Sequence, residues 1–472
     1  MIQSHIENIL NKNLGHKPTD DQLSAIKKIS SFIITNTNDS IFLLTGYAGT
    51  GKTSLINTIV RTLENFNFKS VLLAPTGRAA KVLASYTGRS SFTVHKHIYR
   101  QKSSKDGRGK FDLDRNMHKD AFFIVDEASM ISGEQSEVSL FGSGRLLDDL
   151  IEYIYRGRNC KLILVGDTAQ LPPVGSALSP ALSKTDLALY GFNIEYAELR
   201  EVVRQNRDSG ILMNATRIRA KITDNDLSIP SFRVSPYDDI SRISGESLLE
   251  EIESAYSYAG IDGSVIIVNS NRMANKYNQG IRNRILFREE EICAGDMIMI
   301  VKNNYFWVSG EEELDFIANG DIACIKKVLR KEERYGLRFA DMILDFVDYS
   351  LELEVKVLLD TLGSEKASLS GEQNRMLYES VMQDYSELST KKKRFEAVKN
   401  DPFFNAMQIK FAYAVTCHKA QGGQWERVFI DQGMFNRQEP SVDYLRWLYT
   451  AVTRATDRLY LVNFLPAFFE DD

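Results

Sequence analysis

The sequence predicts an α/β protein with two parallel sheets, a small inserted hairpin and an inserted β-barrel. Three patterns in its 472 residues carry this prediction. Over residues 1–208, short apolar runs alternate with helical patterns, and a similar alternation resumes after residue 208. Between residues 321 and 408, strand-like segments alternate with charge instead, which is typical of a small antiparallel barrel. A chain of this length accommodates about three domains.

Four apolar runs predict the strands of the first sheet. Each run is short, continuous and rich in β-branched or aromatic residues, as strands buried on both faces of a parallel sheet are. Helical stretches separate the runs, which is the βαβ pattern. The runs are IFLL (41–44), SVLLA (70–74), AFFIV (121–125) and KLILV (161–165).

Two stretches interrupt this alternation. A polar segment with an Asp-Gly turn precedes the third run, and we expect a hairpin inserted over about residues 96–120. Residues 133–158 then have a helical pattern that leads into the fourth run.

The second α/β domain is expected to consist of residues 209–320 and 409–472, interrupted by a module at 321–408. GSVIIVNS (263–270) predicts a buried strand followed by a helix. The module combines strand-like segments, for which we expect an SH3-like barrel, with a charged helical stretch near 371–400. The apolar run at 407–416 is expected to return the chain to the second domain.

Composition sets limits on class and compartment. The chain is 43% hydrophobic and 26% charged, as ordinary globular proteins are. A net charge of −5 gives no overall basic footprint for nucleic acid, although it leaves room for a local basic channel. The four cysteines form no CxxC pair, so we expect reduced thiols in the cytoplasm rather than a zinc site. No signal peptide or apolar run of membrane-spanning length is evident.

A phosphate loop follows the first predicted strand. GYAGTGKT (46–53) fits the GxxxxGK[ST] pattern in its strand–loop–helix context. Its glycines let backbone N–H groups face the phosphates, and the helix N-terminus adds a positive dipole end. Lys52 is expected to reach the β- and γ-phosphates, and the Thr53 hydroxyl to bind Mg²⁺. The predicted ATP-binding residues here are Gly46, Tyr47, Ala48, Gly49, Thr50, Gly51, Lys52, Thr53 and Ser54.

Polar side chains end two further predicted strands. Parallel strands bring such groups to one edge of the sheet, where ligands bind. Asp126 is expected to hold Mg²⁺, and Glu127 to orient or deprotonate the attacking water. Asp167 and Gln170 follow the fourth strand, and Gln170 is expected to sense the γ-phosphate or position the water.

The ordered motifs of the chain resemble those of superfamily 1 helicases, most closely the RecD/Dda-like branch. The resemblance runs from about residue 19 to 462. One departure is Gly423, which stands where many relatives have serine or threonine. The motifs are TDDQ, GYAGTGKT, LAPTGRAAKVL, FTVHKHI, IVDEAS, VGDTAQLPPVG, LREVVRQN, YAVTCHKAQGGQWERVFID and LYTAVTRATDRLYLV.

The resemblance implies two RecA-like domains that enclose ATP. Gln22 would read the adenine, and Arg204 and Arg454 would meet the γ-phosphate when the domains close. An arginine supplied on closure stabilises the charge that spreads over the phosphoryl oxygens, so hydrolysis becomes conditional on domain movement. A surface salt bridge is the alternative role for Arg204.

The resemblance also implies a path for single-stranded DNA across both domains, without sequence readout because the contacts go to phosphates. Phe92 and Trp425 are candidates for base stacking or, equally, for core packing. The hairpin at Lys105–Lys110 has the position of a strand-separating pin, or is a surface loop, and the basic run 391–394 contacts DNA or is a solvated helix face. The implied DNA-binding residues are Pro75, Thr76, Arg78, Phe92, Thr93, His95, Thr416, His418 and Lys419.

The leading hypothesis is therefore an ATP- and Mg²⁺-dependent DNA helicase that moves 5′→3′ on single strands and acts at single/double-strand junctions. Two alternatives stay open. One is a translocase without strand separation, and the other is a P-loop ATPase that acts on protein partners. The negative net charge favours the second alternative. RNA is a further substrate that the residues do not exclude. Partners from DNA repair, recombination or replication fit the leading hypothesis.

Overall fold

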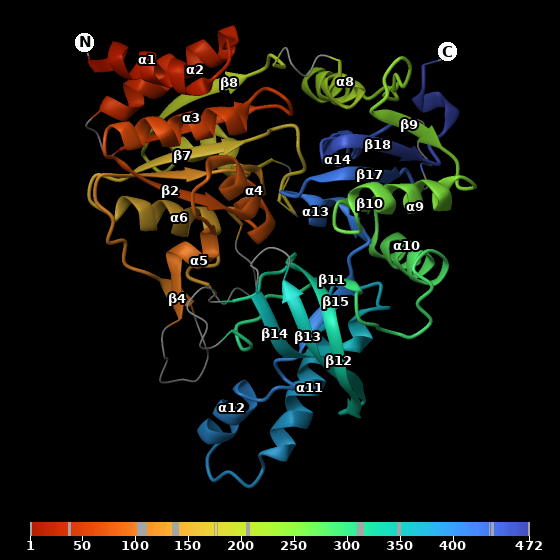
Figure 1. The fold of residues 1–472 in the computed structure, drawn as a ribbon. Coiled ribbons are helices and arrows are strands. Elements are labelled where there is room, and N and C mark those ends of the chain that lie inside the picture. The colour runs from red at the N-terminus through yellow and green to blue at the C-terminus, as the bar shows by residue number, and fades with distance from the viewer. Residues whose placement is uncertain are drawn as a thin grey trace.

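A computed structural model describes residues 2–35, 39–101, 111–134, 141–173, 175–176, 178–203, 208–308, 316–346, 351–433, 435 and 439–470. Within these residues the chain forms two open sheets flanked by helices, a closed barrel and a two-stranded hairpin (Figure 1). The fold is therefore α/β with parallel sheets, as predicted.

The first sheet has six parallel strands in the order β3-β2-β6-β7-β1-β8. The four predicted strands are confirmed as its four central strands. The two edge strands were not predicted, because neither is a continuous apolar run. The bounds are β1 Ser40–Gly46, β2 Lys69–Ala74, β3 Ser91–Thr93, β6 Ala121–Val125, β7 Lys161–Gly166 and β8 Asn193–Leu199.

Helices cover both faces of this sheet, with α1, α2 and α3 on one side and α5 and α6 on the other (Figure 1). Alternate residues of β1 enter the two cores: Ile41 and Leu43 face one, Phe42 and Leu44 the other. The bounds are α1 Ile2–Leu14, α2 Asp20–Ile34, α3 Lys52–Asn65, α4 Gly77–Thr87, α5 Val94–Ile98, α6 Leu146–Tyr155 and α7 Lys184–Ala188.

The helix predicted over 133–158 is shorter than expected. Helix α6 begins only at Leu146, and Gly142 and Gly144 before it have φ values of +42° and +85°. Backbone in the left-handed region does not continue a right-handed helix, so the chain turns here instead.

The predicted hairpin is present. Its strands β4 (Tyr99–Gln101) and β5 (Phe111–Leu113) pair antiparallel. The tip at Lys105–Lys110, where the sequence indicates a pin, lies outside the described residues.

The second sheet has five parallel strands in the order β16-β10-β17-β18-β9. Helices α8 and α14 lie on one side of it, and α9 and α10 on the other (Figure 1). The bounds are β9 Ile240–Ile243, β10 Ser264–Val268, β16 Ala414–Thr416, β17 Trp425–Asp431, β18 Ala455–Val462, α8 Gly210–Asp224, α9 Leu248–Ala259, α10 Asn271–Arg284, α13 Cys417–Ala420 and α14 Val442–Val452.

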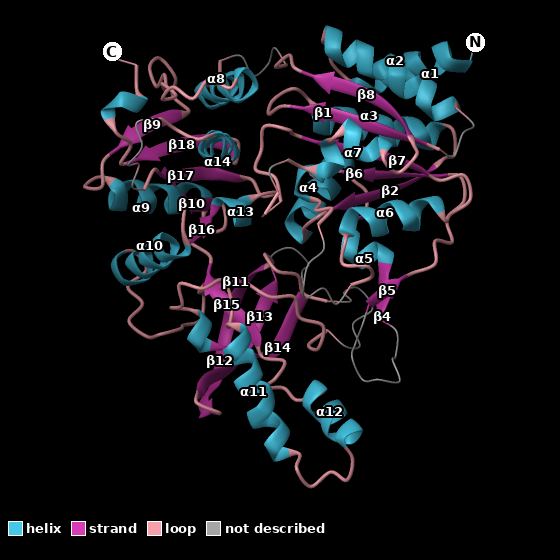
Figure 2. Ribbon diagram, turned by 180° about the vertical axis from the view of Figure 1, so that it is seen from behind, coloured by secondary structure: helices cyan, strands magenta, loops and turns pink. Residues whose placement is uncertain are grey.

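The barrel includes residues on both sides of the predicted module at 321–408. Strand β11 starts at Met297 and closes the barrel by pairing with both β12 and β15, so the chain before 321 and after 408 contributes to it. Two helices follow β14 and extend from the barrel away from both sheets (Figure 2). The bounds are β11 Met297–Ile300, β12 Ile322–Arg334, β13 Leu337–Phe346, β14 Leu351–Leu358, β15 Met407–Phe411, α11 Gly371–Asp384 and α12 Lys391–Lys399.

No helix in the described ranges is both long and apolar enough to cross a bilayer.

Candidate active site and nucleic-acid interface

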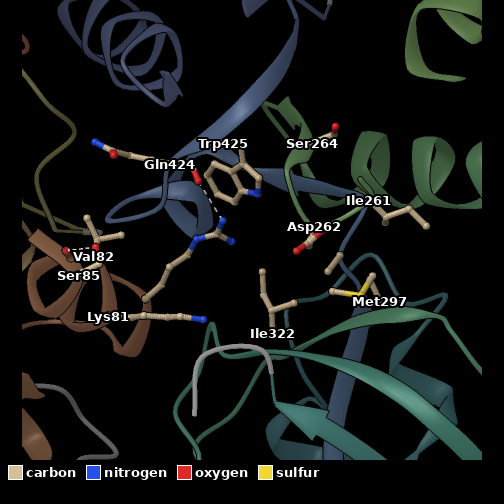
Figure 3. A pocket seen from close by; sticks show the side chains of 12 residues that line it. Lys81, Val82, Ser85, Ile261, Asp262, Ser264, Met297, Ile322, Gln424 and Trp425 are labelled. Carbon is tan, nitrogen blue, oxygen red and sulfur yellow. Dashed lines mark hydrogen bonds between the residues drawn. The ribbon is translucent and has the colours of Figure 1, made fainter. Parts of the chain in front are cut away.

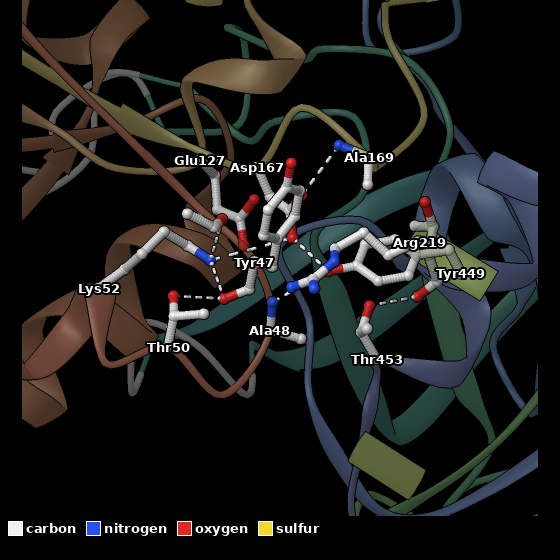
Figure 4. A network of polar contacts seen from close by, with 12 residues as sticks. Tyr47, Ala48, Thr50, Lys52, Glu127, Asp167, Ala169, Arg219, Tyr449 and Thr453 are labelled. Atoms are coloured by element: carbon white, nitrogen blue, oxygen red, sulfur yellow. Dashed lines mark hydrogen bonds and ion pairs between the residues drawn. The ribbon is translucent and has the colours of Figure 1, made fainter. Parts of the chain in front are cut away.

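The predicted phosphate-binding residues form one continuous loop between β1 and the first turn of α3. Gly49 and Gly51 have φ values of +74° and +85°, which residues with a side chain rarely adopt. Lys52 Nζ donates to the carbonyls of Gly46 at 2.7 Å and Tyr47 at 2.9 Å. These bonds hold the ammonium group at the mouth of the loop (Figure 4).

Gln22 is fixed against this loop. It belongs to a capping box at the start of α2, and its Nε2 donates to the Thr50 carbonyl at 3.1 Å. A Cβ at Gly51 would lie 2.5 Å from the same nitrogen, so only glycine fits there. Gln22 is thus part of the loop's packing, and its contact with adenine stays a prediction.

Two carboxylates follow β6. Burial, and then the charge of Glu127, raise the pKa of Asp126 to about 7. Asp126 Oδ1 accepts a bond from the Glu127 N–H at 2.8 Å, and the buried Glu127 Oε2 atom has no hydrogen-bond partner among the described residues. The raised pKa of Asp126 means that its surroundings disfavour the charged carboxylate, and a cation relieves that cost. The residues therefore fit Mg²⁺.

Asp167 follows β7, the neighbour of β6 in the sheet. Its Oδ1 accepts from Ala169 N at 2.9 Å, and its Oδ2 lies 3.9 Å from Lys52 Nζ. The hydroxyl of Tyr449 also donates to Oδ2, at 2.7 Å. Gln170, three residues on, is buried, and no described residue donates a hydrogen bond to its Oε1. The carboxyl edge of the sheet thus gathers the predicted polar groups.

Arg454 reaches this edge from the second domain. It is 3% exposed, and its guanidinium donates to the carbonyls of Thr450 at 3.0 Å and Gly423 at 3.3 Å. Its Nη1 lies 4.0 Å from Glu127 Oε1. Arg204, the second predicted arginine, lies outside the described residues.

Further hydrogen bonds join the two domains beside this site. The Leu171 N–H donates to Thr450 Oγ1 at 2.9 Å, and the Leu171 carbonyl accepts from Gln421 Nε2 at 2.7 Å. The loop after Asp167 is therefore held by two elements of the second domain, α14 and the turn after α13.

The predicted strand contacts of the first domain lie at two helix N-termini. Thr76 Oγ1 caps α4 by accepting from Ala79 N, and Thr93 Oγ1 caps α5 by accepting from Lys96 N. Pro75 directly precedes the first cap, and Phe92, 36% exposed, precedes the second. Both helix starts offer backbone N–H groups to a phosphate.

His95 is enclosed by rings. Its ring meets Phe141 edge-on with centroids 5.0 Å apart, and burial lowers its pKa to about 4 against the opposing charge of Asp149. A neutral imidazole results at pH 7, so a hydrogen bond rather than a full charge is what His95 can offer a phosphate.

Arg78 does not stand free in the cleft. Its guanidinium lies 3.7 Å from the centre of the Trp425 ring and donates to the Gln424 carbonyl at 3.1 Å. Trp425 is 5% exposed, which fits core packing better than base stacking. A Cβ at Gly423 would lie 2.6 Å from the Trp425 ring and 2.9 Å from Arg78 Nε, which accounts for the departure to glycine. This pair borders a cavity of 260 Å³ between α4, the second sheet and the barrel (Figure 3).

The predicted strand contacts of the second domain follow β16. Thr416 is half-buried and His418 is exposed. Within the part of the chain that the structure describes, the buried Lys419 Nζ has no hydrogen-bond partner, and burial, with the charge of Lys410, lowers the pKa of Lys419 to about 8. An anionic ligand would pair with this unsatisfied ammonium group.

Comparisons with known proteins agree with this geometry. A model described as an AAA domain matches residues 18–229, and one described as a UvrD-like helicase C-terminal domain matches residues 411–462. The chain is 25% identical to an uncharacterized protein of Acanthamoeba polyphaga mimivirus, over 93% of this chain and 98% of that protein. It is 24% identical to the ATP-dependent RecD2 DNA helicase of Deinococcus radiodurans over 89% of this chain, but spans 46% of that protein's length.

These two family models and the helicase relatives agree with the resemblance to superfamily 1 helicases of the RecD/Dda-like branch. Among solved structures, a Bacteroides Pif1 helicase in complex with ADP-AlF3 and ssDNA aligns with a TM-score of 0.48 and 15% identity, over 97% of this chain and 95% of that one.

The protein has an aromatic contact between its hairpin and the residues that connect the barrel strands β11 and β12. Phe111 of β5 packs on Tyr305 with centroids 4.5 Å apart, and Phe141 packs on Phe316 at 6.0 Å. The base of the hairpin is thus anchored outside its own domain. The basic run 391–394 lies on α12, and its three lysines are exposed.

Sequence reasoning missed one side chain of the predicted nucleotide site. Tyr449 lies in the quoted YTAVTRA motif, yet only Arg454 was singled out there. An aromatic residue amid an apolar helix gives no local sign of a polar role, because its partners lie 401 and 282 residues away.

Proposed function

We propose that the protein is an ATP-dependent DNA helicase that moves 5′→3′ on single-stranded DNA and separates strands at single/double-strand junctions. One observation carries the proposal: Arg454 of the second domain lies against Glu127 beside the phosphate loop of the first. A site completed by two domains makes hydrolysis depend on their relative position.

The chain's own residues account for hydrolysis as follows. The loop amides and Lys52 bind the phosphates, and Glu127 orients the attacking water and accepts its proton. Gln170 assists in positioning that water. Arg454, with Arg204, stabilises the charge that develops on the transferred phosphoryl group. Mg²⁺, held by Thr53 and Asp126, would neutralise charge on the phosphate oxygens.

The strand is gripped once by each domain in this proposal. Thr76, Arg78, Thr93 and His95 provide the first grip, and Thr416, His418 and Lys419 provide the second. The unsatisfied Lys419 ammonium supports an anionic ligand at this face. Closure on ATP would draw the two grips together, and release after hydrolysis would separate them.

The domain assignment belongs to the same proposal. We take residues 1–208 as the first RecA-like domain and the second sheet with its helices as the other. The five-stranded barrel, of SH3-like type, would hold the strand against both.

Two assays test the function. ATP turnover is measured with and without single-stranded DNA, and strand displacement is measured on duplexes with a 5′ or a 3′ overhang. We expect stimulation by DNA and displacement from the 5′ overhang alone.

The remaining outcomes separate the alternatives. Displacement only from the 3′ overhang contradicts the polarity. Stimulated turnover without displacement indicates a translocase, and turnover indifferent to DNA favours an ATPase that acts on proteins. ATP turnover that is stimulated by RNA but not by DNA would mean that the substrate strand is RNA.

A further inference from the structure

The hydroxyl of Tyr449 crosses from the second domain into the nucleotide site of the first. It accepts a hydrogen bond from the Ala48 N–H at 2.9 Å and donates one to Asp167 Oδ2 at 2.7 Å. Ala48 belongs to the phosphate loop, and Asp167 ends the neighbouring strand β7. One atom of α14 therefore joins two separate elements of the ATP site (Figure 4).

The Tyr449 hydroxyl is buried and stays protonated. Tyr449 is 1% exposed, and its burial and the adjacent Asp167 carboxylate raise its pKa well above the ordinary value, so the proton stays on the oxygen. A neutral hydroxyl is the group that can accept from an amide and donate to a carboxylate at once. Losing it would leave the half-buried Ala48 N–H without this acceptor and the buried Asp167 without one donor.

The same helix presents other groups to the first domain. Thr450, the next residue, accepts from Leu171, and Arg454, two residues after the helix ends, lies beside Glu127. From α8, which packs on α14, the guanidinium of Arg219 lies 4.1 Å from the ring centre of Tyr47 in the phosphate loop. A movement of the second domain that shifts α14 thus reaches the phosphate loop through Tyr449 and the acidic edge through Arg454.

We propose that Tyr449 is a positioning residue for ATP hydrolysis, whose hydroxyl aligns the phosphate loop with Asp167 only when the second domain is docked. The residue acts through Ala48 and Asp167 rather than on the phosphates themselves. This inference rests on the proposed function, because strand binding is what would dock the domains.

Tyr449→Phe tests it, since the ring stays and the hydroxyl is lost. We expect kcat of DNA-stimulated ATP hydrolysis to fall about tenfold, the effect of one hydrogen bond to a charged group, with KM for ATP within about twofold. Tyr444→Phe is the matched control on the same helix. Its hydroxyl contacts Gln432 inside the second domain, so turnover should not change.

A second variant shows whether Tyr449 acts through Asp167. We expect Asp167→Asn also to lower kcat, and the double variant to lose much less than the product of the two single losses. Wild-type kcat in Tyr449→Phe overturns the inference, and so does a lowered melting temperature with unchanged kcat. Independent, multiplicative losses overturn the route through Asp167.

These outcomes are distinct from failure of the proposed function. If single-stranded DNA does not stimulate wild-type turnover, the helicase proposal fails. The basal kcat of Tyr449→Phe still tests whether the hydroxyl aligns the phosphate loop with Asp167. If wild-type turnover is stimulated and Tyr449→Phe behaves alike, only the alignment fails.

Discussion

The two faces of the interdomain cleft differ in how their polar groups are satisfied. On the nucleotide face, the hydroxyl of Tyr449, the hydroxyl of Thr450 and the Gln421 amide all bond to the first domain. On the strand face, the Lys419 ammonium is buried and has no hydrogen-bond partner among the described residues, and Arg78 packs on Trp425 across the cleft. In our proposal the first face transmits domain position through its internal bonds, whereas the second offers the Lys419 ammonium to the strand.

The largest expected effect is on the nucleotide face. Lys52→Ala removes the ammonium that the loop carbonyls hold, and we expect ATP turnover to fall at least on the order of 10³-fold. Steady-state phosphate release measures it. Lys12→Ala, an exposed lysine on α1, is the control and should keep full turnover. Substantial turnover in Lys52→Ala would refute the assignment of the loop.

Glu127→Gln separates binding from chemistry on the same face. The amide cannot accept the water's proton, so we expect turnover to drop by about 10²–10³-fold while ATP still binds. Loss of the Glu127 charge also removes one of the causes that raise the pKa of Asp126. Equilibrium binding of a fluorescent ATP analogue, beside single-turnover hydrolysis, distinguishes the two steps. Weakened binding with normal turnover would contradict the role of general base.

Lys419 tests the strand face. Removing one phosphate contact in Lys419→Ala should weaken single-stranded DNA binding about tenfold and reduce the salt slope by about 1. Fluorescence anisotropy over a salt series measures both. An unchanged slope would mean that Lys419 meets no phosphate.

The pH dependence of strand binding follows from the same lysine. Its pKa is about 8 in the free protein, because burial, and then Lys410, disfavour the charge. A bound phosphate favours the charge, so binding takes up a proton and affinity falls as pH rises through 8. Lys419→Arg, which stays charged, should flatten the profile between pH 7 and about 9. A profile that stays steep in this variant would move the titration to another group.

The local sequence pattern predicted those features that depend on residues close together in the chain. The four apolar runs became the four central strands of the first sheet, and their polar ends meet at one edge. The barrel boundary failed because closure pairs Met297–Ile300 with strands that begin 25 and 110 residues later, which no local texture encodes. Tyr449 was missed for the same reason. Its partners are distant in sequence and its helix is apolar.

The smallest expected effect is the change in DNA affinity when Trp425 is replaced. Its sign distinguishes base stacking from packing against Arg78. If the ring stacked on bases, Trp425→Leu would weaken strand binding. The structure instead has Arg78 over the ring, a contact worth about 0.5–1 kcal/mol at exposed sites. Freeing Arg78 for the strand should therefore raise affinity for single-stranded DNA about two- to fivefold. Basal ATP turnover and the melting temperature check that the variant is folded, and Arg78→Ala together with Trp425→Leu should abolish the gain. A loss of affinity in Trp425→Leu alone would instead assign Trp425 to base stacking.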